Sequence, residues 1–126
     1  MIDLDIEGAT VEKVDNVLPV SIFTSNDWMI KIESDIHISP SIAESGVLDG
    51  EDPDTISILK ESITGLEVVK VEIASSRLHL EFEGSIAIDA QSDPDFESWG
   101  VVGPYGQRIE CMPGGELAVW PERPSE

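Results

Sequence analysis

The side chains best suited to metal binding or nucleophilic chemistry in this sequence are His37, His79 and Cys111. Both histidines lie between apolar neighbours in strand-like segments. A zinc site needs three or four ligands, usually at short spacing. The sequence contains no group of candidate ligands at such a spacing. Cys111 follows Ile109 within another such segment and is expected to be a buried, inert thiol. With no G-x-S-x-G turn either, we expect no cofactor, no metal and no catalytic residues, and histidines that are solvated or locally hydrogen-bonded.

Acidic clusters offer a different kind of chemistry. Residues 49–54 place four carboxylates in six positions, but not at the spacing of a calcium loop. Helix capping by Asp52 with solvated charge is one interpretation, and a patch for a basic partner is the other. The Asp-Pro-Asp sequence recurs at residues 93–95. The candidate partner-binding residues are Asp49, Glu51, Asp52, Asp54, Asp93, Asp95 and Glu97.

Net charge is the one extreme property of the chain. It has 26 acidic and 7 basic residues, which gives a net charge of −19. Such a chain repels nucleic acid and anionic membranes and attracts basic partners. Solubility alone also explains surplus Asp and Glu. We therefore expect no nucleic-acid or membrane partner, and a basic protein partner is one of two open interpretations.

Length and composition favour a single domain over residues 1–126. One cysteine excludes an internal disulfide, which fits a reducing compartment. The first residues lack the basic and apolar parts of a signal peptide, and no apolar run could span a membrane. A cytoplasmic protein is the expectation.

An internal repeat relates residues 8–54 to residues 65–95. G-x-x-V-x-K-V occurs at residues 8–14 and 65–71, and the apolar positions of residues 28–38 match those of residues 78–88. Each copy predicts a strand followed by a hairpin, with turns at residues 33–35 and 83–85. Residues 16–26 and 39–50 are extra in the first copy and are expected to be loops.

Other elements follow from local patterns. Asp52-Pro53-Asp54 predicts a helix start, with an apolar stripe at Ile56, Leu59 and Ile63 and an end at Gly65. After residues 93–95 we expect at most one or two helical turns. Alternation over residues 2–7 predicts an N-terminal strand with an acidic face. The three tryptophans, Trp28, Trp99 and Trp120, are expected to be buried or half-buried.

The stretch CMPGGELAVW at residues 111–120 raises the choice between a phosphate loop and a hairpin. A phosphate loop needs a lysine and a following helix, whereas here β-forming residues follow the glycines. A C-terminal hairpin within residues 101–120 is therefore predicted. The fold class is α+β and mostly β: two related antiparallel meanders in a curved sheet or partly open barrel, with one helix packed on it.

Three motifs near the C-terminus carry a resemblance. They are Phe96-Glu97-Ser98-Trp99, Gly103-Pro104-Tyr105-Gly106 and residues 113–120, PGGELAVW. Together they resemble the C-terminal signature of a family of small uncharacterised bacterial proteins, common in actinobacteria. The resemblance covers about residues 77 to 120 and implies a fold rather than an activity. Small acidic proteins of this kind are similar to immunity proteins by analogy alone.

The leading functional hypothesis is a non-enzymatic immunity-type inhibitor that docks on a basic toxin, for example a nuclease. The alternative is a small-molecule-binding or enzymatic domain of unknown reaction that uses the concave face of the sheet. A third possibility is a self-associating module. We expect a monomer or weak dimer.

Overall fold

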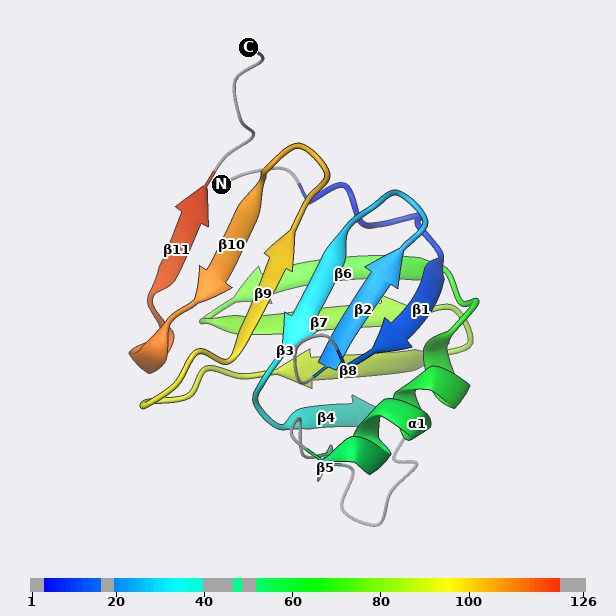
Figure 1. Ribbon diagram of the computed structural model, residues 1–126, viewed down its shortest axis with the longest axis horizontal. Coiled ribbons are helices and arrows are strands. Elements are labelled where there is room, and N and C mark those ends of the chain that lie inside the picture. Colours follow the sequence, from blue (N-terminus) through cyan, green and yellow to red (C-terminus); the bar gives the residue numbers. More distant parts are fainter. Residues whose placement is uncertain (1–3, 17–19, 40–46, 49–51, 121–126) are drawn as a thin grey trace.

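The computed structural model describes residues 4–16, 20–39, 47–48 and 52–120. These residues form two antiparallel sheets, not closed into a barrel, with one helix beside them (Figure 1). The elements are β1 Val11–Asp15, β2 Val20–Thr24, β3 Met29–Ile32, β4 Ile36–Ser39, β5 Val47–Leu48, α1 Pro53–Ile63, β6 Val68–Ala74, β7 Arg77–Phe82, β8 Ile86–Ala90, β9 Trp99–Val102, β10 Arg108–Cys111, the 3₁₀ turn Pro113–Gly115 and β11 Leu117–Trp120.

The larger sheet has the order β1-β2-β3-β9-β10-β11, and the smaller has the order β5-β4-β8-β7-β6. The predicted mostly β fold with one helix is confirmed. Consecutive strands form two meanders, β1-β2-β3 and β6-β7-β8, one in each sheet. The C-terminal hairpin is also confirmed, because β10 pairs with β11 across a turn in which Gly114 has a φ of +85°.

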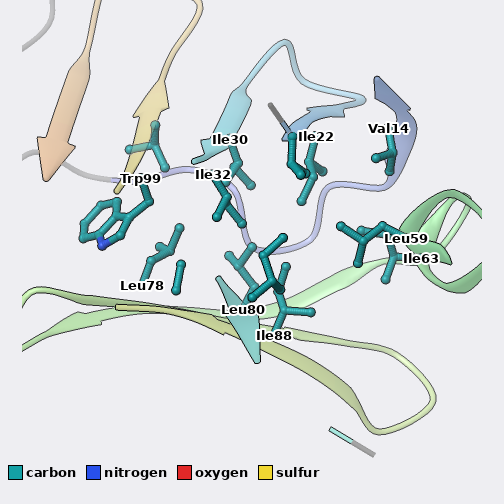
Figure 2. Close-up of a cluster of buried hydrophobic side chains, with 14 of the residues drawn as sticks. Val14, Ile22, Ile30, Ile32, Leu59, Ile63, Leu78, Leu80, Ile88 and Trp99 are labelled. Atoms are coloured by element: carbon teal, nitrogen blue, oxygen red, sulfur yellow. The ribbon is translucent and has the colours of Figure 1, made fainter. Parts of the chain in front are cut away.

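The inner faces of the two sheets pack against each other and form the core. Ile22, Ile30, Ile32 and Trp99 of the larger sheet face Leu78, Leu80 and Ile88 of the smaller (Figure 2). Trp28 and Trp99 are buried, as expected, while Trp120 is 47 % exposed. The Nε1 of Trp99 donates a hydrogen bond to the carbonyl of Ser76, 3.0 Å away, so its polar atom is satisfied inside the core.

Helix α1 follows the predicted signals. The Asp52 carboxylate accepts a hydrogen bond of 2.9 Å from the amide of Asp54, which satisfies one free donor of the first turn. Leu59 and Ile63 are fully buried and lie near Val14 of β1 (Figure 2). Gly65, with a φ of +87°, follows the helix end.

The hairpin predicted over residues 33–35 is wrong. β3 and β4 belong to different sheets, so these residues cross from one sheet to the other. The matching hairpin over residues 83–85 is confirmed, because β7 pairs with β8. Gly84 and Ser85 there both have positive φ, which a tight hairpin requires, and residues 33–35 contain no glycine.

Two further predictions need correction. The extra residues 16–26 are not all loop, because β2 runs through them and pairs on both sides. Residues 5–8 form a turn rather than a strand, and Gly8 takes a φ of +91° within it. Residues 94–96 form a bend without helical turns, which lies within the predicted limit of one or two turns. In that bend Asp93 accepts hydrogen bonds from the amides of Asp95 and Phe96.

Candidate functional site

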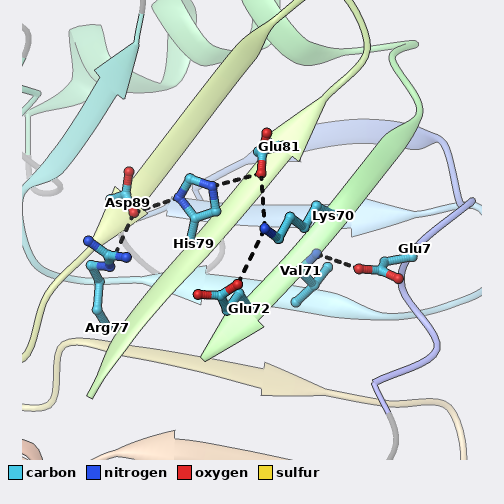
Figure 3. Close-up of polar contacts among 8 residues, drawn as sticks. All are labelled: Glu7, Lys70, Val71, Glu72, Arg77, His79, Glu81 and Asp89. Atoms are coloured by element: carbon cyan, nitrogen blue, oxygen red, sulfur yellow. Dashed lines mark hydrogen bonds and ion pairs between the residues drawn. The ribbon is translucent and has the colours of Figure 1, made fainter. Parts of the chain in front are cut away.

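A network of paired charges covers the outer face of the smaller sheet. We call Lys70, Glu72, Arg77, His79, Glu81 and Asp89 the His79 cluster (Figure 3). Strand alternation puts these side chains outside, because Leu78, Leu80 and Ile88 take the inward positions on the same strands. The sheet register then sets them opposite one another across β6, β7 and β8.

His79 lies between two carboxylates. Its Nδ1 is 2.7 Å from Oδ1 of Asp89, and its Nε2 is 3.1 Å from Oε2 of Glu81. Partial burial is the largest single influence and lowers the pKa of His79, but the hydrogen bonds and charges of Asp89 and Glu81 together outweigh it. The pKa of His79 is therefore raised, and the imidazolium form, which donates from both nitrogens, satisfies both carboxylates.

The other members extend this pairing along the face. Nε of Arg77 is 3.4 Å from Asp89, and Nζ of Lys70 is 3.4 Å from Glu72 and 3.8 Å from Glu81. Each cation thus neutralises carboxylates that would otherwise repel one another across neighbouring strands. A histidine held as a cation in this way supports the sheet rather than acting as a general base.

The side chains that the sequence analysis considered for metal binding, His37, His79 and Cys111, are not brought together. His37 is exposed on β4. Cys111 is buried in β10, and the Sγ atom of Cys111 lies 3.7 Å from the carbonyl of Ser76. No group of three or more His, Cys, Asp or Glu side chains able to hold a metal ion occurs in the part of the chain that the structure describes. The expectation that a histidine would be locally hydrogen-bonded is confirmed at His79.

The predicted acidic residues lie in two separate places. Asp49 and Glu51 fall outside the described residues. Asp52 and Asp93 both bond to a backbone amide two residues further on, so each stabilises a local turn. Asp54, Asp95 and Glu97 are exposed. Figure 1 shows the bend around Asp95 well apart from α1, so the described candidates form two acidic surfaces rather than one.

A third acidic surface was missed by sequence reasoning. We call Asp5, Glu7, Asp27, Glu67 and Glu83 the acidic end. Backbone contacts gather their segments: Asn26 bonds to the carbonyl of Asp5, Thr10 pairs with Glu67, and the amide of Glu67 bonds to Glu83. No single stretch of sequence contains the cluster, because its members come from four segments.

A buried ion pair on the outer face of the larger sheet was also missed. Nζ of Lys31 is 2.8 Å from Oε1 of Glu110, and their side chains are 10 % and 2 % exposed. Nε of Arg108 donates to the same oxygen at 2.7 Å. Gly100 lies between the pair, and a Cβ there would stand 2.6 Å from Oε2 of Glu110. Any side chain at position 100 would therefore force Lys31 or Glu110 out of its present position.

Comparison with known proteins identifies the chain's family. The model of the family of unknown function DUF6188 matches residues 2–121, nearly the whole chain, so the protein belongs to this family. The class defined by the fold is a mostly β protein of two stacked antiparallel sheets and one helix. No curated protein and no solved structure matches. No helix among the described residues is long and apolar enough to cross a membrane.

The raised pKa of His79 predicts a pH-dependent stability. Because the folded state holds this proton more tightly, the contribution is complete below about pH 6.5, the usual unfolded pKa of histidine. It is lost as the pH rises through the folded-state pKa. We expect the free energy of unfolding to fall over that interval in the native chain and to fall less in His79→Gln. Urea unfolding across pH, with an NMR titration of His79, measures both; identical pH profiles would contradict the assignment.

Removal of Lys31 should be destabilising, because it leaves the buried Glu110 charge paired with the half-exposed Arg108 alone among the described residues. We expect Lys31→Met to lower the free energy of unfolding by about 2–3 kcal/mol, less than the loss for a buried charge with no partner. Lys13→Met is the matched control: its pair with Asp15 is 3.9 Å long and largely exposed, so a loss below about 1 kcal/mol is expected. Urea unfolding of the two variants tests this, and equal losses would show that burial of the pair is not decisive.

Proposed function

We propose that this chain is a non-enzymatic acidic binding protein, an immunity-type inhibitor that docks on a basic toxin such as a nuclease. The observation that carries the proposal is how its charges are distributed. Lys13, Lys31, Lys70, Arg77 and Arg108 each lie within 4 Å of a carboxylate. These pairs use cations on the outer faces of the sheets, and they leave exposed acids of several turns without an ion pair among the described residues.

The acidic end has the features that an electrostatic docking surface needs. Asp5, Glu7, Asp27, Glu67 and Glu83 are all exposed, and none of them forms an ion pair within the described part of the chain. Hydrogen bonds fix the segments that bear them, so little order must be gained on binding. A groove that handles nucleic acid is basic, and an acidic surface of this kind accelerates encounter with it.

Charge-reversal variants can locate the docking surface. One variant, Asp5→Lys with Glu67→Lys, alters the acidic end, and a second, Asp49→Lys with Glu51→Lys, alters the sequence-predicted patch. Asp52 is left in place because it caps α1. The control, Glu61→Lys with Glu116→Lys, changes two other exposed acids and gives the same net charge.

The partner is captured from the producing host with the tagged native chain at low salt, and association rates are then measured for each variant. We expect the variant that alters the docking surface to associate about tenfold more slowly than the control, with the difference shrinking at high salt. If all three variants associate equally fast, or if no basic partner is captured, the proposal fails.

The alternative, a small-molecule-binding or enzymatic domain, has one observation in its favour. A mostly apolar pocket of about 400 Å³ is lined by Phe23, Trp28, Met29 and Val102, together with the charged residues Glu12, Lys13 and Asp27. That volume is within the range of ligand sites. A thermal-shift screen against metabolites, repeated with Met29→Trp to fill the pocket, tests this alternative. A stabilising ligand whose effect disappears in the variant would favour it over the immunity role.

A further inference from the structure

The outer face of the larger sheet carries an ordered row of side chains, one from each of its six strands. The strand register sets Lys13, Phe23, Met29, Val102, Arg108 and Trp120 opposite one another in that order. We call this set the cation–aromatic row. Read across the sheet, it consists of a cation, an aromatic ring, two apolar side chains, a second cation and a second aromatic ring.

The row is accessible, and it consists of residue types typical of interfaces. The Lys13 and Arg108 side chains are 58 % and 47 % exposed, and Trp120 is 47 % exposed. Nζ of Lys13 lies 4.7 Å from the ring centre of Phe23, and Cζ of Arg108 lies 5.1 Å from that of Trp120. Aromatic residues, methionine and arginine are enriched in protein–protein interfaces.

Charge points to one kind of occupant. The described charged residues of this face are Lys13, Lys31 and Arg108 against Asp15 and Glu110. The acids Glu12 and Asp27 line the pocket at one end of the row, so three cations and four anions leave this surface at −1. The whole chain carries −19. A second copy of the chain is equally acidic, and this nearly neutral face is where two copies meet with the least repulsion between facing groups.

We propose that the cation–aromatic row is the docking surface for a second copy of this chain. A two-fold axis parallel to the strands, between β3 and β9, reverses the order of the row. Lys13 then faces the partner's Trp120, Phe23 faces the partner's Arg108, and Met29 faces the partner's Val102. Every cation meets an aromatic ring, and the apolar side chains meet at the axis, so the surface is complementary to itself.

The pocket beside Phe23 fits this arrangement. It is lined by Lys13, Phe23, Met29 and Val102, and the two-fold axis sets the partner's Arg108 and Trp120 over that end of the row. Strand spacing makes the six-stranded face only about 24 Å wide. An interface of this width lies at the low end of the size range for specific contacts, so the dimer is weak and depends on protein concentration.

Sedimentation equilibrium of the full chain, over a wide concentration range in low and high NaCl, tests the proposal. We expect a monomer–dimer equilibrium that strengthens as salt rises, because salt screens the repulsion between two chains of −19. Docking of a basic partner has the opposite salt dependence, so the outcome here is independent of the proposed function. A chain that stays monomeric at the highest concentration and salt overturns the proposal.

Variants at the two ends of the row locate the interface. Lys13→Ala on β1 and Trp120→Ala on β11 should each weaken the dimer about tenfold, since each removes two symmetry-related cation–aromatic contacts. Lys70→Ala and Phe96→Ala are matched controls, because both side chains are exposed outside the row. Circular dichroism checks that each variant is folded. A dimer weakened by Trp120→Ala but not by Lys13→Ala would instead indicate pairing along the β11 edge and overturn the face-to-face arrangement.

Discussion

One carbonyl group, that of Ser98, ties together the two places where the described chain passes between the sheets. The amides of Glu33 and Ser34 both donate to it, at 2.8 and 3.1 Å. Residues 33–35 lead from β3 to β4, and residues 91–98 lead from β8 back to β9. With these crossings side by side, β3 can pair with β9 in one sheet while β4 pairs with β8 in the other. The pairing of β3 with β9 and of β4 with β8 joins the two meanders to the rest of the sheets in which they lie.

Strand alternation and turn chemistry were enough to predict most elements, but they could not predict sheet membership. The segments around residues 33–35 and 83–85 have the same apolar pattern, yet only the second forms a hairpin. Gly84 was the available signal, because it permits the positive φ that a tight turn needs. The prediction of an N-terminal strand was wrong for a different reason. Ile6 is buried in the core and Glu7 bonds to the amide of Val71, so tertiary contacts override the alternation of residues 2–7.

Prediction of the candidate site was limited in the same way. Asp52 could be assigned as a cap because capping is local. The acidic end and the His79 cluster could not, because their members come from different segments and meet only through long-range pairing. A lone lysine in the apolar stretch of residues 28–32 and a lone glutamate between Ile109 and Cys111 were visible signals of a buried ion pair. Each remains ambiguous until the register of β3, β9 and β10 is known.

The two outer faces show two ways of placing charge on a β-sheet. On the smaller sheet the pairs are at least partly exposed, so each contributes little energy and mainly prevents repulsion between like charges on neighbouring strands. On the larger sheet the Lys31–Glu110 pair is buried, and desolvation offsets much of its attraction. Its stronger effect is on register. A one-residue slip of β10 would turn Glu110 into the core and Ile109 outwards, leaving Lys31 unpaired. The same register aligns Arg108 and Trp120 with Val102. The buried pair therefore also fixes which side chains lie opposite one another on the outer face of this sheet.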